Sequence, residues 1–483
     1  MLVSAREDQP RPDEHLHHCM PFRSLRLTTK QSMGTLWIDA TDLKKWKGPK
    51  TGIPRVVGCL VRELLTLHDA GSQPCVFDET AATFRPFEAA DALYPDPSPS
   101  GVSDRRLHNR IEPLVSALRH KIPQDLWNPL RLVGSDAYHL LVDSSRLISS
   151  VGRWLLHHRD DSPRVPLADA LQGALRFSHD DVLLALGSTW GCRDYPEAVA
   201  KLKQQGGFKV AHLIYDLIPA KFPHFYPAGF SDEFRNWVTS ILRVADVIVV
   251  ASENTRKDLE LLSRQNGVRC PAIGVIRLGD EVPTSGLASA PASHVRLGAR
   301  FILCVGTIEA RKNQALLYQV WSRLLETHGA SIPKLVIVGH PGLLARDFLT
   351  LVREDPALRE HIVVLTETTD PELVWLYEHC LFTVYPSIYE GWGLPVAESV
   401  ARGKYCITSA SASLPEIAGD LLDYHSPWDS GECYKLVERA IQDAHFLKDR
   451  ENAIRARYKR TSWKETAESV LSFLGRTPVH TRD

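Results

Sequence analysis

Short apolar runs alternate along the chain with stretches in which apolar side chains recur every three or four residues, a pattern that predicts strands separated by helices. Each run is continuously apolar, which is typical of a parallel sheet covered by helices on both faces. The runs form two series, at residues 36–38, 182–186, 210–215 and 247–250, and at residues 301–305, 335–338, 362–365 and 381–385.

Residues 281–297 separate the two series, and their Ser, Ala, Pro and Gly content is typical of a hinge. We therefore predict an α/β fold with two Rossmann-like domains that face a cleft, at residues 34–282 and 298–450. Residues 1–33 are polar and aperiodic, so we expect a mobile arm there. A helical pattern in the C-terminal segment, 451–483, predicts a helix that packs on either domain, followed by a tail.

Composition narrows the class of protein. The 483 residues are enough for two or three domains, and 44% hydrophobic with 24% charged residues excludes a wholly disordered or fibrous chain. The 57 basic and 58 acidic residues nearly balance, which argues against a dedicated nucleic-acid binder. No apolar run reaches the roughly 18 residues of a transmembrane helix. The polar N-terminus lacks the apolar stretch of a signal peptide, so a cytoplasmic protein is expected.

The nine cysteines are scattered, odd in number and without a C-x-x-C pair. Several of them sit inside apolar runs, as Cys304 does. We therefore expect buried free thiols in a reducing compartment instead of a disulfide framework or a metal site.

One segment, residues 104–131, is rich in Arg interleaved with Leu and Trp. We expect a helical insertion that packs on the first domain and solvates its basic side. The alternative is peripheral contact with an anionic membrane surface, because a basic helix with an apolar face can lie on one.

The most informative motif, at residues 390–398, follows a predicted buried strand and leads into a helix. Its glycines allow close backbone approach, and the N–H groups of Gly393, Leu394 and Val396 are expected at a helix N-terminus that can hold a phosphate. Glu390 stands just ahead of this site, and Glu398, one turn into the helix, can accept two hydroxyls of a ribose. A turn whose glutamates merely cap the helix is an equal alternative from these residues alone.

A second motif, at residues 305–313, leaves the first strand of the second domain and enters a helix, which is a usual place for a ligand loop. Arg311 and Lys312 can neutralise a diphosphate, the first by a bidentate grip and the second as a point charge. A helix dipole disfavours cations at its start, so two solvated cations are the weaker explanation.

These residues resemble a known family. Glu390 and Glu398 match the E-x7-E motif of glycosyltransferase family 4, retaining enzymes of the GT-B fold, with the E-G-W-G-L-P spacing intact. Gly306, Thr307, Arg311, Lys312 and Asn313 match a second motif of that family. Residues 413–416 resemble its S-x-L-P-E turn, and the three motifs occur in the family's order across about residues 300–445.

The resemblance implies roles for these residues. Arg311 and Lys312 would contact the diphosphate of a nucleotide sugar, Glu398 would hold the ribose, and Glu390 would position the donor sugar. Thr366, at the end of its strand, would lie near the base. The remaining donor-site residues implied are Gly306, Thr307, Asn313, Gly393 and Leu394.

The first domain carries two further resemblances. Residues 50–56 resemble the T-G-I-x-R-V loop of the family, in which Gly52 would approach the ligand and Arg55 would add charge to the phosphates. A plain helix start is nearly as good an explanation for Arg55. Residues 215–219 resemble its H-D-L-x-P segment, but Tyr215 stands where His is usual, so Asp216 becomes the candidate catalytic group on the acceptor side. Residues 252–255 are a similar loop, for which we favour a helix N-cap.

Taken together, the resemblance implies a retaining glycosyltransferase that moves a sugar from a nucleotide-diphosphate donor to a glycan or lipid-linked glycan in surface-polysaccharide biosynthesis. GDP-mannose is the first candidate donor. The donor would bind the second domain and the acceptor the first, at the inner face of the membrane or in the cytoplasm. No metal or other cofactor is expected, because no Asp-x-Asp motif ends a strand and the two cations can replace a divalent ion. A catalytically silent carbohydrate-binding protein is the alternative, and the absence of a suitable G-x-G-x-x-G argues against a dehydrogenase.

Overall fold

The computed structural model describes residues 34–45, 52–67, 71–88, 173–284, 288–291, 297–298 and 300–475. The expected arm at 1–33 and the basic segment at 104–131 lie outside these residues. The expected linker, 281–297, is described only in part.

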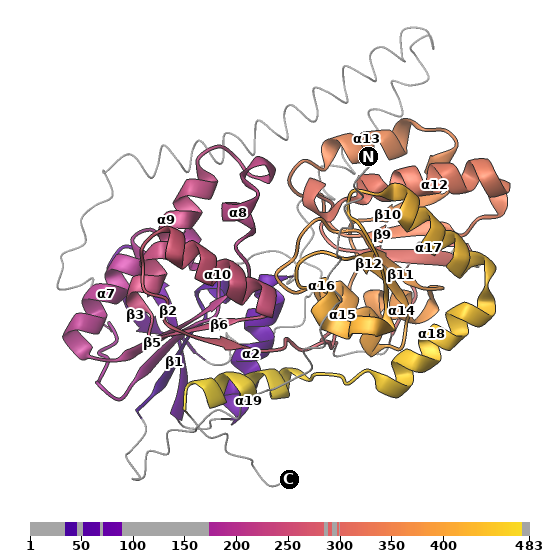
Figure 1. The fold of residues 1–483 in the computed structure, drawn as a ribbon. Helices are drawn as coiled ribbons and strands as arrows, with labels where there is room; N and C mark the ends of the chain where they lie inside the picture. Colours follow the sequence, from indigo (N-terminus) through magenta and orange to yellow (C-terminus); the bar gives the residue numbers. More distant parts are fainter. Residues whose placement is uncertain are drawn as a thin grey trace, which may run out of the picture. The chain divides into compact units, whose positions relative to one another are not determined.

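The first sheet has seven strands in the order β3-β2-β1-β4-β5-β6-β7, shown from indigo to magenta in Figure 1. All neighbouring strands are parallel except β2 and β3, which form an antiparallel hairpin. The strands are β1 Leu36–Asp39, β2 Ser72–Asp78, β3 Thr83–Pro86, β4 Val182–Ala185, β5 Lys209–Ile214, β6 Val247–Val250 and β7 Ala272–Val275.

The second sheet has six strands, all parallel, in the order β10-β9-β8-β11-β12-β13. The strands are β8 Phe301–Val305, β9 Lys334–Val338, β10 Ile362–Leu365, β11 Thr383–Tyr385, β12 Cys406–Ser409 and β13 Asp423–His425. Two Rossmann-like sheets, as the apolar runs predict, are thus confirmed.

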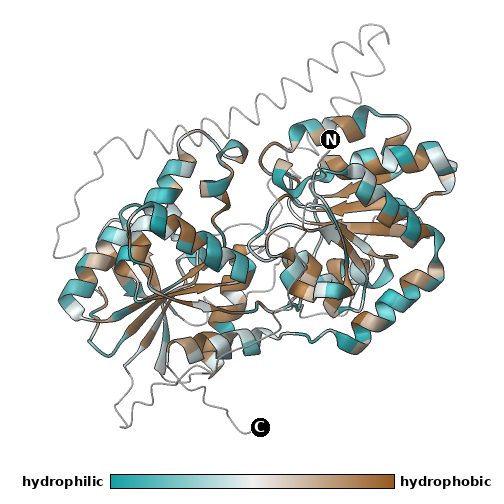
Figure 2. Cartoon of the chain, in the orientation of Figure 1, coloured by the Kyte–Doolittle hydropathy of each residue, from teal (hydrophilic) through white to brown (hydrophobic). Residues whose placement is uncertain are grey.

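Helices connect the parallel strands, and their apolar sides cover the sheets, whose strands are the brown centre of each domain in Figure 2. The helices between the strands of the first sheet are α1 Thr41–Lys45, α2 Ile53–Leu67, α7 Tyr195–Gly206, α8 Ile218–Lys221, α9 Phe230–Val244 and α10 Glu253–Gln265. Those of the second domain are α12 Gln314–His328, α13 Arg346–Glu354, α14 Asp370–His379, α15 Leu394–Ala401, α16 Leu414–Ala418 and α17 Ser430–Gln442. Short 3-10 turns include η3 Pro223–Phe225 and η4 Ala310–Lys312.

The end of the chain folds as two helices, α18 Ala444–Arg457 and α19 Trp463–Phe473. Helix α19 packs against α2 of the first domain (Figure 1). The Trp463 indole N–H donates to the carbonyl of Glu281 at 3.0 Å, and the Thr466 hydroxyl donates to the carbonyl of Arg277 at 2.9 Å. The first domain is therefore completed by residues that follow the second domain in sequence.

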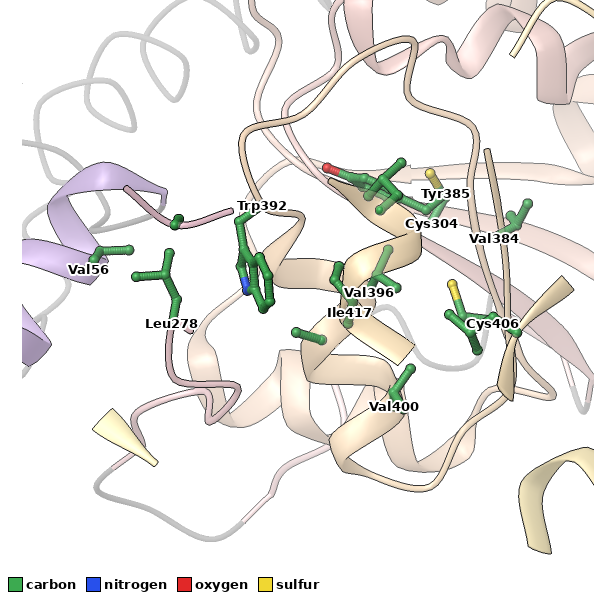
Figure 3. Close-up of a cluster of buried hydrophobic side chains, with 14 of the residues drawn as sticks. Val56, Leu278, Cys304, Val384, Tyr385, Trp392, Val396, Val400, Cys406 and Ile417 are labelled. Carbon is green, nitrogen blue, oxygen red and sulfur yellow. The ribbon is translucent and has the colours of Figure 1, made fainter. Parts of the chain in front are cut away.

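One apolar cluster contains side chains of both sheets and of the segment between the sheets. Figure 3 shows Trp392 of the 390–398 motif with Val56 and Leu278 on one side and Val396 and Ile417 on the other. The Arg277 guanidinium lies 5.3 Å from the centre of the Trp392 ring. The motif therefore contributes to the apolar packing as well as to the polar site.

Eight of the cysteines fall within the described residues, and all eight are free thiols; seven are buried and Cys270 is half-buried. The expectation of buried free thiols is confirmed for these seven. Within the described part of the chain, no helix combines the length and the apolar character that crossing a membrane requires.

Candidate active site

The loops that follow β8 and β11 lie side by side, because these two strands are neighbours in the parallel sheet. The loop after β8 contains η4, with Arg311 and Lys312. The loop after β11 runs through Ser387 to Glu390, and the N–H of Ile388 donates to the carbonyl of Arg311 at 2.8 Å. This backbone bond fixes the two cations beside the carboxylate of Glu390.

Glu390 is paired with both cations. The Lys312 ammonium lies 2.6 Å from Oε1 of Glu390, and the Arg311 guanidinium lies 3.0 Å from its Oε2. Arg311 also pairs with Glu309, at 2.6 Å, and donates to the carbonyl of Tyr389 at 2.7 Å. Two cations and two carboxylates thus form one network within the second domain.

Two hydroxyls orient the Glu390 carboxylate. Tyr385, the last residue of β11, donates to Oε1 at 2.9 Å, and Ser387 donates to the same oxygen at 2.6 Å. Lys312 in turn donates to the Tyr385 hydroxyl at 2.7 Å. Because Glu390 is only 7% exposed, these bonds replace the water that a free carboxylate would have.

The charges of the network change its acid–base behaviour. Burial alone would raise the pKa of Glu390, but Arg311 and Lys312 outweigh burial and lower it to about 2. Burial lowers the pKa of Lys312, although Glu390 opposes this. The pKa of Arg311 is raised, because the charges of Glu390 and Glu309 outweigh its burial. Glu390 is therefore an anion at neutral pH, suited to positioning and not to donating a proton.

Glu398, the second carboxylate of the motif, lies apart from this network. It is 2% exposed; its Oε1 lies 3.0 Å from the Arg55 guanidinium, and its Oε2 accepts from the Tyr377 hydroxyl at 2.9 Å. Arg55 also lies 2.5 Å from a carboxylate oxygen of Asp370. Arg55, expected to face phosphates, is thus an ion-pair partner of the residue expected to hold the ribose.

The first domain meets the motif at the end of β5. The backbone at Gly391 approaches Tyr215 so closely that a Cβ at residue 391 would lie 2.1 Å from the Tyr215 carbonyl oxygen. The side chain of Asp216 lies next to this contact. Burial raises the pKa of Asp216, and the charge of Arg311 opposes that rise. Asp216 therefore stands within the electrostatic field of Arg311 and Lys312.

Neither Tyr215 nor His212 on β5 replaces the missing histidine as a base. The Tyr215 hydroxyl donates to the carbonyl of Leu186 at 2.7 Å, and burial holds its pKa well above its usual value. His212 is fully buried, which lowers its pKa to about 4. Asp216 also accepts a bond from the N–H of Ile218 at 2.9 Å, so it has a local structural role as well.

Tyr389, which precedes Glu390, connects the motif to the first domain. Its hydroxyl bonds to the Lys221 ammonium at 2.6 Å and to the Asn254 amide at 2.7 Å, and it donates to Asp258. The residue before the motif thus contacts two helices of the other domain, α8 and α10.

The loop at 252–255 is a helix start, as predicted: the Ser252 hydroxyl accepts from the N–H of Thr255 at 3.0 Å. An added feature is Glu416 of the S-x-L-P-E turn. Its carboxylate accepts from the N–H groups of Glu253 and Asn254, both at 2.8 Å, so the second domain also caps α10.

The remaining predicted residues form the surrounding loops. Gly306 and Gly393 have φ of 148° and 114°, and Leu394 begins α15. The Asn313 amide donates to the carbonyls of Pro386 and Pro427, at 3.2 and 2.8 Å, and so links two loops. Thr307 is exposed, Thr366 directly follows β10, and Gly52 precedes α2 at φ 58°.

One local expectation was wrong. Helix α15 begins at Leu394, and the N–H of Val396 donates to the carbonyl of Gly393 at 3.0 Å. Val396 therefore does not offer a free N–H to a phosphate, because the helix begins early enough to use it.

Residues that the motifs did not single out complete the site. Glu309 is the second counter-ion of Arg311, Tyr385 and Ser387 orient Glu390, and Tyr377 orients Glu398. Only Glu309 had a sequence signal, a charge two residues before Arg311. Within the residues that the structure describes, no group of three or more His, Cys, Asp or Glu is arranged to hold a metal ion.

Comparison with known proteins finds a family match for the second domain. The model of the family described as glycosyl transferases group 1 matches residues 290–460. A serotype-specific mannosyltransferase, WbdA of Escherichia coli, is 26% identical over 313 residues, which are 62% of this chain and 37% of that protein. The O-antigen chain mannosyltransferase B of Escherichia coli is 24% identical over 59% of this chain and 75% of that protein. The chain therefore spans somewhat more than a third of the WbdA relatives that it matches.

Solved structures support the fold over nearly the whole chain. Alr3699/HepE of Anabaena, in complex with UDP and glucose, aligns with a TM-score of 0.55 over 92% of this chain and 99% of that chain, at 15% identity. The expected GT-B architecture is confirmed. Residues 290–460 thus match the model of the glycosyl transferases group 1 family, in a chain whose fold has two Rossmann-like sheets.

Proposed function

We propose that the chain is a retaining glycosyltransferase of family 4 that moves a sugar, with mannose from GDP-mannose as the first candidate, to a glycan or lipid-linked glycan in surface-polysaccharide assembly. The observation that carries the proposal is the pair of half-buried cations, Arg311 and Lys312, held against Glu390 by the loops after β8 and β11. A cation pair at the carboxyl ends of parallel strands is suited to a diphosphate.

The donor is proposed to lie along the second domain. Its diphosphate would lie beside Arg311 and Lys312, its ribose would meet Glu398, and its base would lie near Thr366. Gly306, Thr307, Asn313, Gly393 and Leu394 would shape the surrounding loops. Arg55 and Gly52 would complete the site from the first domain.

The proposed reaction is attack on the same face of the donor sugar. The acceptor oxygen forms a bond to the anomeric carbon while the bond from that carbon to the diphosphate oxygen breaks. The departing diphosphate takes the acceptor proton, and Arg311 and Lys312 stabilise the negative charge that develops. Asp216 is proposed to orient the acceptor hydroxyl, and Glu390 to orient the donor sugar. The two cations are proposed to act without a divalent metal.

The choice of mannose and of a polysaccharide rests on the relatives, since WbdA and mannosyltransferase B are both mannosyltransferases by name. HepE was solved with UDP and glucose, so a UDP-sugar is the second candidate donor. We propose that the protein acts in the cytoplasm, and peripheral contact with the inner face of a membrane through residues 104–131 is the alternative to an insertion that packs on the first domain.

Thermal unfolding with a panel of UDP-, GDP- and dTDP-sugars tests the donor assignment. A donor at 100 times its dissociation constant stabilises the folded protein by about 2.7 kcal/mol, which raises the unfolding temperature measurably. The stabilising donor is then incubated with candidate acceptors, and the anomeric configuration of the product is determined by NMR. Inversion would contradict the retaining mechanism, and no stabilisation by any nucleotide sugar would favour a catalytically silent carbohydrate-binding protein.

A further inference from the structure

A small pocket lies where the first domain faces the loop that carries Arg311. Phe225 and Tyr226 of the first domain form one wall, and the opposite wall comes from Glu309, Ala310, Arg311 and Leu343 of the second. The pocket therefore borders the cation network directly, but its aromatic wall belongs to the domain that is expected to bind the acceptor.

The aromatic wall is part of a larger group of rings. Residues 222–230 contain Phe222, His224, Phe225, Tyr226 and Phe230. The His224 and Phe225 rings have centroids 4.3 Å apart, and Tyr226 and Phe230 are stacked at 5.4 Å. Phe225 and Tyr226 nevertheless remain half-exposed. Their neighbours hold these rings in place, so a ligand that stacks on them finds an ordered surface.

The charges around Tyr226 keep its hydroxyl neutral. Burial raises the pKa of Tyr226, and the negative charge of Asp216 raises it further. The charges of Arg311, Glu309 and Glu390 also act on this group, which places Tyr226 in the field of the donor site. The wall thus combines an apolar ring face with a neutral hydroxyl, next to a carboxylate and a guanidinium.

A pyranose ring has matching chemistry, because one face presents C–H groups and the edge presents hydroxyls. The C–H face packs on the electron-rich face of an aromatic ring, and the hydroxyls bond to charged and polar groups at the rim. We infer that Phe225 and Tyr226 form a stacking platform for a pyranose ring of the acceptor saccharide, with Glu309 and Arg311 at its polar rim.

The inference rests on the proposed function, and it assigns the platform to the acceptor and not to the donor sugar for a structural reason. Apart from Gly52 and Arg55, the groups expected to hold the donor belong to the second domain, whereas both rings come from the segment after α8 in the first. A ring stacked there lies beside Arg311, where a hydroxyl of the acceptor can reach the leaving diphosphate.

Saturation-transfer difference NMR on the full chain tests the platform. The probes are GDP, UDP and GDP-mannose on one side, and an α-linked mannobiose, maltose and N,N′-diacetylchitobiose, each with saturating nucleotide, on the other. The variants are Phe225→Ala with Tyr226→Ala, Tyr226→Phe, and Phe473→Ala as the matched control. Phe473 is an aromatic residue of α19 that is 44% exposed and lies outside the pocket.

We expect wild type to transfer saturation to the ring C–H protons of at least one saccharide. The double variant should bind that saccharide at least about tenfold more weakly than wild type, whereas its affinity for the nucleotide should change less than about twofold. Tyr226→Phe and Phe473→Ala should keep saccharide binding. Nucleotide binding by wild type supports the proposed function separately, so its absence would count against that function and not against the platform.

The platform would be overturned by an absence of saturation transfer to any saccharide in wild type, by equal saccharide binding in the double variant, or by a loss of binding that is specific to GDP-mannose over GDP. The last result would assign the rings to the donor sugar. A loss in Tyr226→Phe equal to that of the double variant would show a hydroxyl contact in place of stacking and would also reject the proposal.

Discussion

The two glutamates of the 390–398 motif have similar surroundings but different origins for their partners. Both are buried, and each accepts from a tyrosine hydroxyl and pairs with an arginine. The arginine of Glu390 is Arg311, which belongs to the same domain. The arginine of Glu398 is Arg55, which lies 343 residues earlier, on α2 of the first domain.

The cluster around Glu390 and the cluster around Glu398 therefore depend on different parts of the fold. Folding of the second domain alone brings Arg311, Lys312 and Glu390 together, so their geometry is set before any ligand or other domain arrives. The pair of Arg55 and Glu398 needs both domains in contact. Perturbing the first cluster should therefore affect chemistry most, and perturbing the second should affect the joining of the domains.

The largest effect is expected for the first cluster. Lys312→Ala and Glu390→Ala should each lower turnover by about 10²–10³-fold or more, because each removes a charge next to the reacting groups. Unfolding temperatures should show that both variants remain folded. Lys464→Ala, at an exposed position of α19, is the control. Near-normal turnover in both variants would contradict the assignment of Lys312 and Glu390 to the donor site.

A stability effect is expected for the second cluster. Arg55→Met should destabilise the protein by about 3–5 kcal/mol, because it leaves the buried Glu398 and the adjoining Asp370 without their cation. Adding Glu398→Gln should restore part of the loss, so the double variant should be more stable than the sum of the single changes. Denaturant unfolding of wild type, of the two single variants and of the double variant measures this difference. Strictly additive losses of stability would disprove the coupling between Arg55 and Glu398.

Acid pH distinguishes the first cluster further. The pKa of Glu390, lowered to about 2, means that its ion pairs stabilise the protein fully above the pKa of an unfolded glutamate, about 4.3, and that this stabilisation is lost as pH falls toward 2. A pKa shift of this size contributes about 3 kcal/mol to the free energy of unfolding at neutral pH. The stability difference between wild type and Glu390→Gln should therefore shrink between about pH 5 and pH 2. A constant difference across that range would contradict the lowered pKa.

Removing the charge of Glu309 should raise the affinity for nucleotide instead of lowering it. Its carboxylate occupies one side of Arg311 and repels an incoming diphosphate. Glu309→Gln should therefore bind GDP or UDP about three- to tenfold more tightly in calorimetric titration, which is about 1 kcal/mol. Glu360→Gln, at a surface pair with Arg359, provides the control and should leave affinity unchanged. Weaker binding in Glu309→Gln would show that this carboxylate supports the nucleotide instead.

The smallest effect is expected from chelation. If Arg311 and Lys312 supply the positive charge that other transferases take from a divalent ion, EDTA should leave turnover within experimental error. Activity that EDTA abolishes and magnesium or manganese restores would contradict the proposed metal independence.

The sequence predicted the strands that are continuous apolar runs, including β10 at a sheet edge, and missed β3 and β13 at sheet edges and β2 inside the first sheet. β4, β5, β8 and β9 are continuous apolar runs because helices cover both faces. The strands β3 and β13 at the sheet edges are short and carry polar residues, since one edge meets no neighbour, so their sequences resemble loops. Tertiary pairing, not local pattern, makes them strands.

The same distinction holds for the site. Arg311, Lys312 and Glu390 were identified because each lies in a local motif at the end of a strand. The partner of Glu398 could not be found in this way, because Arg55 reaches it through the contact between domains. The close approach of Gly391 to Tyr215 could not be predicted either, because the sequence around a glycine does not indicate which backbone segment it will contact.

The position of α19 has a consequence for synthesis. A ribosome makes α2 and the whole first sheet long before it makes Trp463–Phe473, yet apolar residues of α2 and of α19 share one core cluster. The nascent first domain therefore waits, with this side of α2 uncovered, until the second domain has left the exit tunnel. A chain that stalls or is cut before residue 463 would expose that surface and become a substrate for chaperones or proteases.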